Sequence, residues 1–363
     1  MKLKISRKKL QDAAQTTHGV VTTKNTLPIL SNILIEAENN KLHLTTTDLD
    51  MAITCQTEAK VIQQGATTVP AKRFTDIIKE LAEEEVTITA KKNNIVTIDC
   101  QNAYFKVNSL PKEEFPKLPN YKNQESITIE QTKLKNMLNM TSFAISHDET
   151  RYILNGVLFE IRPQKITMVA TDGRRLAFIE REHDTKIQKP RKMIVPIKAI
   201  NELQRALKDG EAKIYFGQNQ TTFDLGGVVI ISRLIEGEFP KYEQVIPKEH
   251  KEKLRVDRDQ LLAAARRANL LTNQDSQAIK LDVFKNKMVV SKNTPDVGEA
   301  REELETEYKG SDLSIGFNPT YLIDALKNID VEKIGLELTA PDKPGVIRTP
   351  DNFIYVVLPM QLG

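Results

Sequence analysis

An internal repeat is the feature of this sequence that most constrains its fold. The tetrapeptide EFPK stands at 114–117 and again at 238–241, so that its phenylalanines are 124 positions apart (239 − 115). Asp48, in LTTTDLDMAI, and Asp172, in MVATDGRRLAF, are also 124 positions apart (172 − 48). Landmarks that recur at one offset indicate a chain built from successive copies of one structural unit.

Turn signals recur with nearly the same period. Residues 39–40 (Asn-Asn), 163–164 (Pro-Gln) and 285–286 (Lys-Asn) follow one another at intervals of 124 (163 − 39) and 122 (285 − 163) positions. The flanking residues alternate between apolar and polar, which is typical of half-buried antiparallel strands. The sequence therefore predicts a β-hairpin at each of these three places.

Amphipathic helices are predicted between the hairpins. The segments 69–81, 194–207 and 316–329 place apolar residues at i, i+3, i+4 and i+7, interrupted only at Gln204, which predicts one buried face for each helix. A second helix is predicted in each copy, over 7–19, 131–145 and 258–272.

Together these patterns predict three copies of a unit of about 121 residues (363/3). Each copy is expected to pack two helices on antiparallel sheet, which places the chain in the α+β class. Stretches rich in Pro and Lys near 111–125 and 240–253 are the expected joints. We therefore expect domains over 1–125, 126–250 and 251–363.

The composition is that of an ordinary globular protein, with 40% hydrophobic and 28% charged residues. The first residues contain no apolar run that could serve as a signal peptide, and no segment approaches the length of a transmembrane helix. Cys55 and Cys100 are expected to be buried free thiols in a reducing cytoplasm, with a disulfide between them as the alternative.

Motifs of common catalytic and metal sites are absent from the sequence. There is no GxxxxGK[ST] phosphate loop, no HExxH, CxxC or GxSxG, and the five histidines have no ligand spacing. Asp48 and Asp50 could be a metal pair, but Asp48 and Asp172 occupy equivalent turns and are expected to cap backbone groups there. We expect no catalytic residue, no metal and no cofactor.

Basic residues recur on the outer side of the repeated helix. Lys79, Arg205 and Lys327 occupy equivalent positions (205 − 126 and 205 + 122), and Lys72 is the equivalent of Lys198 (198 − 126). These bases could form an ordinary solvated helix face or a weak positive surface for phosphate groups, which carries no sequence information. The net charge of +3 neither indicates nor excludes nucleic acid.

In combination, several phrases resemble one family over the whole chain. NTLPILSNILIEA, LTTTDLDMAI, GATTVPAKRF, TRYILNGVLFE, MVATDGRRLAF, GEFPKYEQVIP and the terminal YVVLPMQL are similar to the bacterial sliding clamp family, the beta subunit of DNA polymerase III. The resemblance implies a DNA clamp fold in which two chains join head to tail, so that six domains surround duplex DNA. It also implies a non-catalytic processivity factor that slides without sequence specificity.

The partners that the resemblance implies are macromolecules. They are double-stranded DNA, a second copy of the chain, the DNA polymerase III alpha subunit, an ATP-driven clamp loader, and other polymerases and repair proteins that carry clamp-binding peptides. For DNA contact the resemblance implies Lys24 and Lys198 directly, and the helix phase adds Lys72, Lys79, Arg205 and Arg266.

The resemblance also implies the residues of the joint between two chains. Phe105 and Val107, in an edge strand of the first domain, are expected to meet Leu270 and Leu271 of the third. These two leucines could instead be an ordinary core pair at a helix end. Acidic residues 302–303 are expected to pair with bases across the joint, although exposed ion pairs contribute only about 0–1 kcal/mol each.

A surface pocket for partner peptides is the last implied site. An apolar cleft with a few polar groups suits a short peptide with apolar anchors. The matching residues are Leu154, Thr171, Gly173, Arg175, Leu176, Pro240, Val245, Val356, Val357, Pro359 and Met360. Residues 356–358 could instead be a buried final strand. The family often ends VMPMRL, whereas this chain has Leu358, a volume-conserving change, Gln361, which removes a rim charge, and an extra Gly363.

Two rival functions remain open at this point. An enzyme could bind an anionic substrate at the TDGRR turn, 171–175, where two arginines follow a glycine. A module that merely coats DNA would lose its affinity as salt rises.

Overall fold

The structure, a computed structural model, describes residues 1–21, 27–82, 84–91, 93–247 and 252–362. Its described residues form two compact units. Unit 1 comprises Met1–Leu134 and Asn201–Leu234, and unit 2 comprises Lys135–Ile200 and Ile235–Gly363. Among the described residues, no helix combines the length and the apolar character needed to span a membrane.

The six predicted helices are confirmed, each within its predicted segment. They are α1 (Arg7–His18), α2 (Ala71–Glu80), α3 (Gln131–Ser142), α4 (Ile197–Ala206), α5 (Arg258–Asn269) and α6 (Pro319–Asn328). Local signals fix some of their starts. The Asp257 side chain accepts a hydrogen bond from the Gln260 N–H at the start of α5, and Asn318 caps α6 in the same way ahead of Pro319.

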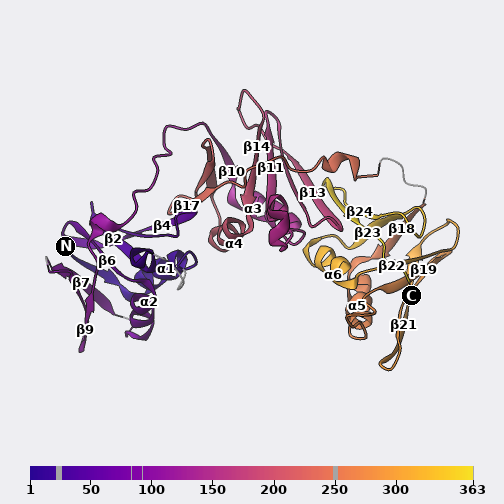
Figure 1. Ribbon diagram of the computed structural model, residues 1–363, viewed down its shortest axis with the longest axis horizontal. Helices are drawn as coiled ribbons and strands as arrows, with labels where there is room; N and C mark the ends of the chain where they lie inside the picture. Colours follow the sequence, from indigo (N-terminus) through magenta and orange to yellow (C-terminus); the bar gives the residue numbers. More distant parts are fainter. Residues whose placement is uncertain (22–26, 83, 92, 248–251, 363) are drawn as a thin grey trace. The chain divides into compact units, whose positions relative to one another are not determined.

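Unit 1 contains two antiparallel sheets, in the orders β5-β1-β7-β8-β9 and β10-β15-β16-β17-β4-β3-β2-β6. In Figure 1, α1 and α2 lie side by side, and α1 also packs on β3 and β4. The core between them includes Leu10, Phe74 and Ile78, all fully buried. The strands are β1 (Lys2–Ser6), β2 (Asn32–Glu38), β3 (Lys41–Thr47), β4 (Met51–Glu58), β5 (Lys60–Gln63), β6 (Gly65–Pro70), β7 (Glu85–Lys91), β8 (Ile95–Cys100), β9 (Ala103–Asn108), β10 (Ser126–Glu130), β15 (Glu211–Phe216), β16 (Gln220–Asp224) and β17 (Val228–Arg233).

Unit 2 contains one antiparallel sheet, in the order β14-β11-β12-β13-β25-β24-β23-β18-β21-β20-β19-β22. Helices α5 and α6 pack against each other beside it (Figure 1). The strands are β11 (Gly156–Arg162), β12 (Lys165–Thr171), β13 (Arg175–Glu182), β14 (Arg191–Pro196), β18 (Glu252–Asp257), β19 (Ile279–Phe284), β20 (Lys287–Thr294), β21 (Gly298–Glu307), β22 (Leu313–Phe317), β23 (Lys333–Leu338), β24 (Gly345–Arg348) and β25 (Phe353–Val357).

The three predicted hairpins are present as β2–β3, β11–β12 and β19–β20. Asn39 and Asn40 both have positive φ, which the tight turn between β2 and β3 requires and asparagine tolerates. Cys55 and Cys100 are buried free thiols, as expected. The fold is therefore the α+β arrangement with repeated helix pairs that the sequence predicts.

Candidate functional site

The TDGRR turn, 171–175, is the best-defined structural element among the candidate residues. It joins β12 to β13, and the Asp172 Oδ1 atom accepts hydrogen bonds from the N–H groups of Arg174 (2.9 Å) and Arg175 (3.0 Å). Thr171 Oγ1 accepts from the Gly173 N–H and donates to the Arg175 carbonyl. Gly173 has φ +86°, a conformation that favours glycine. The expected capping role of Asp172 is confirmed.

The same turn occurs in the first copy of the repeat. Asp48 Oδ1 accepts from the N–H groups of Asp50 (3.1 Å) and Met51 (2.7 Å), and Thr47 Oγ1 accepts from the Leu49 N–H. Leu49 has φ +79°, close to the value of its counterpart Gly173. The carboxylate of Asp48 therefore caps a turn, and within the described ranges no three His, Cys, Asp or Glu side chains are grouped to hold a metal.

Arg175 links three elements of unit 2. Its guanidinium donates to Asp172 Oδ2 (3.1 Å), Asp324 Oδ2 on α6 (2.8 Å) and the carbonyl of Phe143, just after α3 (2.7 Å). It also lies 4.5 Å from the ring centre of Tyr321. Only 10% of the Arg175 side chain is exposed. Burial alone would lower the pKa of Arg175, but Tyr355 and the two carboxylates raise it, so the guanidinium stays charged.

Strands β13 and β25 pair directly, which brings the turn beside the end of the chain. Leu176 lies opposite Val356, and both belong to an apolar cluster on one face of the sheet. Phe178 and Ile354 extend this cluster, which we call the apolar seam (Leu176, Phe178, Ile354 and Val356). Val357 lies on the other face of β25 and is fully buried, so that it can affect a ligand only through its neighbours.

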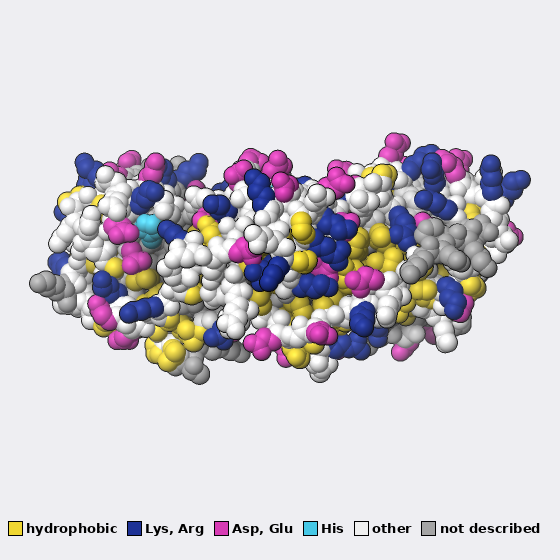
Figure 2. Space-filling model, turned by 90° about the horizontal axis from the view of Figure 1, so that it is seen from above, with side chains coloured by type: hydrophobic (Ala, Val, Ile, Leu, Met, Phe, Trp, Pro, Cys, Tyr) yellow, Lys and Arg dark blue, Asp and Glu magenta, His cyan; other side chains and the backbone are white. Residues whose placement is uncertain are grey.

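The segment 235–247 covers part of the apolar seam. Tyr242, in the short helix η4 (Tyr242–Gln244), is buried against the seam, whereas Val245 is 47% exposed and Pro240 is exposed. Leu154, at the end of η3 (Glu149–Leu154), is buried. In Figure 2, apolar side chains bordered by Lys and Arg side chains gather in the right half of the view.

The tail, residues 358–362, continues from β25 along the edge of this site. The Leu358 N–H donates to the Arg174 carbonyl (2.9 Å), and the Met360 N–H donates to the Gly316 carbonyl on β22 (2.8 Å). Leu358 is 39% exposed, and Pro359 and Met360 are half-buried. All eleven expected pocket residues therefore belong to unit 2, and several of them line the turn, the seam or the tail.

One exposed arginine beside the turn was not predicted from the sequence. Arg151, in η3, directs its Nη1 atom to the Asp172 carbonyl (3.4 Å), and a side chain at Gly173 would lie 2.8 Å from it. The phrase TRYILNGVLFE contains Arg151, but only its Leu154 was predicted to be a site residue. Arg151 lies before strand β11, so the alternation of apolar and polar residues along the strand does not single it out.

A cavity of about 570 Å³ adjoins the seam beyond Tyr242. Its lining includes Phe178 and Tyr242. The Tyr242 hydroxyl donates a hydrogen bond to Glu160 Oε2 (3.3 Å), and the Glu160 side chain is only 1% exposed. Arg162 Nη2 lies 2.7 Å from the same carboxylate oxygen, and Lys192 also pairs with Glu160. Burial and this carboxylate raise the pKa of Tyr242, which keeps its hydroxyl protonated.

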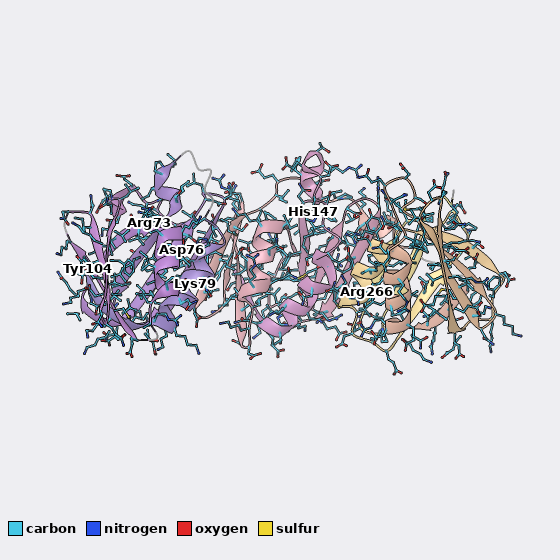
Figure 3. The ribbon with its side chains drawn as sticks, turned by 90° about the horizontal axis from the view of Figure 1, so that it is seen from below. Arg73, Asp76, Lys79, Tyr104, His147 and Arg266 are labelled. Atoms are coloured by element: carbon cyan, nitrogen blue, oxygen red, sulfur yellow. The ribbon has the colours of Figure 1, made fainter. Side chains whose placement is uncertain are left out.

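Five of the six expected DNA-facing bases lie on helices. Lys72 and Lys79 on α2, Arg205 on α4 and Arg266 on α5 are exposed, and Lys198 is half-buried. Figure 3 shows Arg73, Asp76 and Lys79 along α2 and Arg266 on α5. Arg205 is paired with Glu202 at 2.7 Å, although its side chain is 71% exposed. Lys24 lies outside the described residues.

The candidate joint residues differ in exposure. Leu270, which caps the end of α5, is 79% exposed, and Leu271 is half-buried, so Leu270 is no core residue. On β9, Val107 is 4% exposed and belongs to the core of unit 1. Phe105 points to the same side, whereas Tyr104 is 60% exposed (labelled in Figure 3) and was not predicted from the sequence.

The two acidic residues expected to pair across the joint already have partners within the chain. Glu302 accepts from Arg267 Nε at 2.8 Å, and Glu303 lies 2.8 Å from Lys287 and 3.1 Å from Arg301. The pKa of Glu303 is lowered by its hydrogen bond with Lys287. These contacts lie within one chain, and the expected pairing of residues 302–303 with bases of a second chain stays a prediction.

Three family models match the chain in order. They are those of the N-terminal, central and C-terminal domains of the DNA polymerase III beta subunit, over residues 1–119, 128–241 and 243–361. Among similar proteins, the beta sliding clamp of Chlamydia pneumoniae is 34% identical over all of this chain and 99% of its own length. That of Escherichia coli K12 is 32% identical over the full length of both.

Solved structures show the same likeness in three dimensions. The DNA polymerase sliding clamp of Pseudomonas aeruginosa has a TM-score of 0.94 at 34% identity, and that of Bacillus subtilis has a TM-score of 0.96 at 28% identity. Both comparisons cover the whole of each chain.

Proposed function

Because the chain belongs to the DNA polymerase III beta subunit family, we propose that it is a sliding clamp, the processivity factor of the bacterial replicative polymerase. The observation that carries this proposal is the full-length likeness to beta sliding clamps in sequence and in structure. In this role the protein is a non-catalytic subunit in the cytoplasm. It encircles duplex DNA and tethers the polymerase to it.

The ring consists of two chains joined head to tail, each with domains over 1–125, 126–250 and 251–363. The ranges of the three family models support these domains, although the boundary at 250–251 lies outside the described residues. A head-to-tail contact closes into a ring when its rotation permits. Sheet edges support the joint, since among the described strands β9 pairs only with β8, and residues 298–305 of β21 pair only with β20.

The joint combines this strand pairing with an apolar contact at Leu270 and Leu271. An exposed strand edge is a template for pairing with another chain. Residues 298–305 of β21 carry four glutamates and one arginine, whereas Lys106 is the charged residue of β9, so the two edges have opposite charge. Leu270 offers the apolar surface that such a contact would bury.

The DNA-facing surface is formed by basic residues, five of which lie on the helices. The proposed set is Lys24, Lys72, Lys79, Lys198, Arg205 and Arg266. Lysine and arginine contacts to phosphate are independent of sequence and weaken with salt, which suits a protein that slides. Asp76 on α2 and the pairing of Arg205 with Glu202 reduce the positive potential, which favours weak contact.

Partner proteins dock at the eleven-residue pocket built around the turn, the seam and the tail. Exposed apolar groups such as Val245 and Leu358, together with the exposed Arg151 at the turn, suit a short peptide with apolar anchors. The polymerase alpha subunit, the clamp loader, and other polymerases and repair proteins would share this pocket.

The alternative of an enzyme at the TDGRR turn has no support. The guanidinium of Arg175 already donates to two carboxylates and a carbonyl, so three of its five N–H groups are used within the chain. The carboxylate of Asp172 is likewise occupied with capping the turn.

Replacing the exposed bases Lys72, Lys79, Arg205 and Arg266 together by Ala is expected to weaken binding of the unloaded protein to linear duplex. Each lost phosphate contact should reduce the slope of log K against log salt by about 0.9. Fluorescence anisotropy of labelled duplex across a salt series measures this slope. The dimer should remain intact.

The control variant replaces four exposed loop lysines, Lys117, Lys122, Lys186 and Lys189, and so removes the same charge. It should leave the slope nearly unchanged. Equal losses in the two variants would mean that net charge alone attracts DNA and that the helices are not the interface.

A further inference from the structure

We propose that Gly316 is a positioning residue of the partner pocket, because its lack of a side chain lets the tail lie against β22. The inference rests on the proposed function, since it assigns to Gly316 a part in holding Leu358, Pro359 and Met360 where a partner peptide meets them. It concerns a residue that makes no direct contact with the peptide.

The tail is held at two points by backbone hydrogen bonds. Leu358 N–H is bound to the Arg174 carbonyl (2.9 Å), and Met360 N–H is bound to the Gly316 carbonyl (2.8 Å), in an isolated bridge between the tail and β22. Pro359, between them, has no N–H to donate. The tail thus spans from the TDGRR turn to the outer edge of β22, and its position depends on both ends.

Space, not backbone conformation, explains the glycine at 316. The positive-φ glycines of the described chain do not include Gly316, so another residue could adopt its backbone angles within β22. A Cβ atom there, however, would lie 2.6 Å from the Met360 carbonyl oxygen and 2.8 Å from Leu362 Cδ2. The leucine end can rotate away, but the carbonyl belongs to the backbone of the tail itself.

An alanine at 316 would therefore push the tail off β22. To regain ordinary contact, the Met360 carbonyl would have to move by about 1 Å. Such a shift strains the hydrogen bond between the Met360 N–H and the Gly316 carbonyl. It also moves Leu358, Pro359 and Met360, and a displacement of this size is enough to spoil a binding site.

The test compares Gly316→Ala with Gly227→Ala. Gly227 also lacks a positive φ, and a Cβ there meets only the Gln56 carbonyl at 3.9 Å, so alanine should fit without adjustment. The probe is a fluorescein-labelled peptide that carries the clamp-binding segment of a DNA polymerase III alpha subunit. Anisotropy gives its affinity, and amide hydrogen exchange followed by NMR reports on the Leu358 and Met360 N–H groups.

For Gly316→Ala we expect about tenfold weaker peptide binding, equivalent to about 1.4 kcal/mol, and faster exchange at Met360, with an unchanged dimer. Gly227→Ala should bind like the wild type. Unchanged exchange, or faster exchange with undiminished peptide affinity, would overturn the role assigned to Gly316. A wild-type chain that binds no such peptide would instead refute the partner pocket itself, and the inference with it.

Discussion

Replacing Leu270 and Leu271 together by Ala should convert the dimer into monomers. Leu270 exposes 79% of its surface in the single chain, so its apolar area is available for burial in a joint. Allowing for the half-buried Leu271, the two truncations should cost about 3 kcal/mol per joint. A closed ring has two joints, so the dimer loses about 6 kcal/mol, or about 20,000-fold in its dissociation constant.

Analytical ultracentrifugation at micromolar concentration measures this change directly. The control is Ile62→Ala, which truncates a side chain that is 51% exposed on β5, outside the proposed joint, and should leave the dimer intact. A double variant that stays fully dimeric would show that the joint lies elsewhere, and the proposed contact with β9 would then be wrong.

Substituting Arg175 by Ala should destabilise unit 2 strongly. The substitution leaves Asp172 (16% exposed) and Asp324 (28% exposed) facing each other without their common cation, and it frees the Phe143 carbonyl. Removing one partner of a buried ion pair typically costs about 3–5 kcal/mol. The TDGRR turn, the end of α3 and the middle of α6, where Asp324 lies, should loosen together.

Arg174→Ala is the matched control for this change. Arg174 is the neighbouring arginine of the same turn, but its side chain is exposed, and its loss should alter stability by less than about 0.5 kcal/mol. Hydrogen exchange resolves the two units, so faster exchange in Arg175→Ala should be confined to unit 2. Equal stability of the two variants would show that the observed ion pairs contribute nothing to the fold.

Sequence periodicity predicts the local elements of this fold because their causes are local. The segment 194–207 has a helical apolar pattern, and α4 occupies Ile197–Ala206 within it. Asparagines at 39–40 mark a turn whose positive φ values they tolerate. The turn caps Asp48 and Asp172 are predictable from position alone, since a short carboxylate reaches N–H groups two and three residues ahead.

The pairings between distant strands could not be predicted in this way. β17 pairs with β4, and β13 pairs with β25, so that continuous sheets cross the copies of the repeat. No local signal specifies such a partner, because each strand offers two edges and many strands have similar patterns. The partners of Arg175 on α6 and after α3 follow from these pairings and were missed for the same reason.

Some differences in burial between neighbouring site residues follow from the alternation of side chains along a strand. Val356 and Val357 point to opposite faces of β25, so that only Val356 belongs to the apolar seam. On β9, Phe105 and Val107 share the core side, which leaves Tyr104 exposed. Side chains alternate between the two faces of a strand, and this alternation can be read from the sequence. It is therefore sufficient to assign the residues of each strand to the buried or the exposed face. The domain boundaries and the DNA-facing set remain predictions.

Retention on DNA tests the central claim, that the protein is a ring linked topologically to duplex. The chain is loaded onto nicked circular duplex with a clamp loader, passed through a sizing column in high salt, and then passed through it again after the circle is cut once. Contact by charge alone would be lost in high salt from both forms, since each phosphate contact is salt-sensitive.

The proposed function predicts that the protein elutes with intact circles in high salt and is released when the same circles are made linear. If the protein is lost from intact circles in high salt, although loading has been demonstrated at low salt, the ring is contradicted. The protein would then bind DNA by surface contact alone.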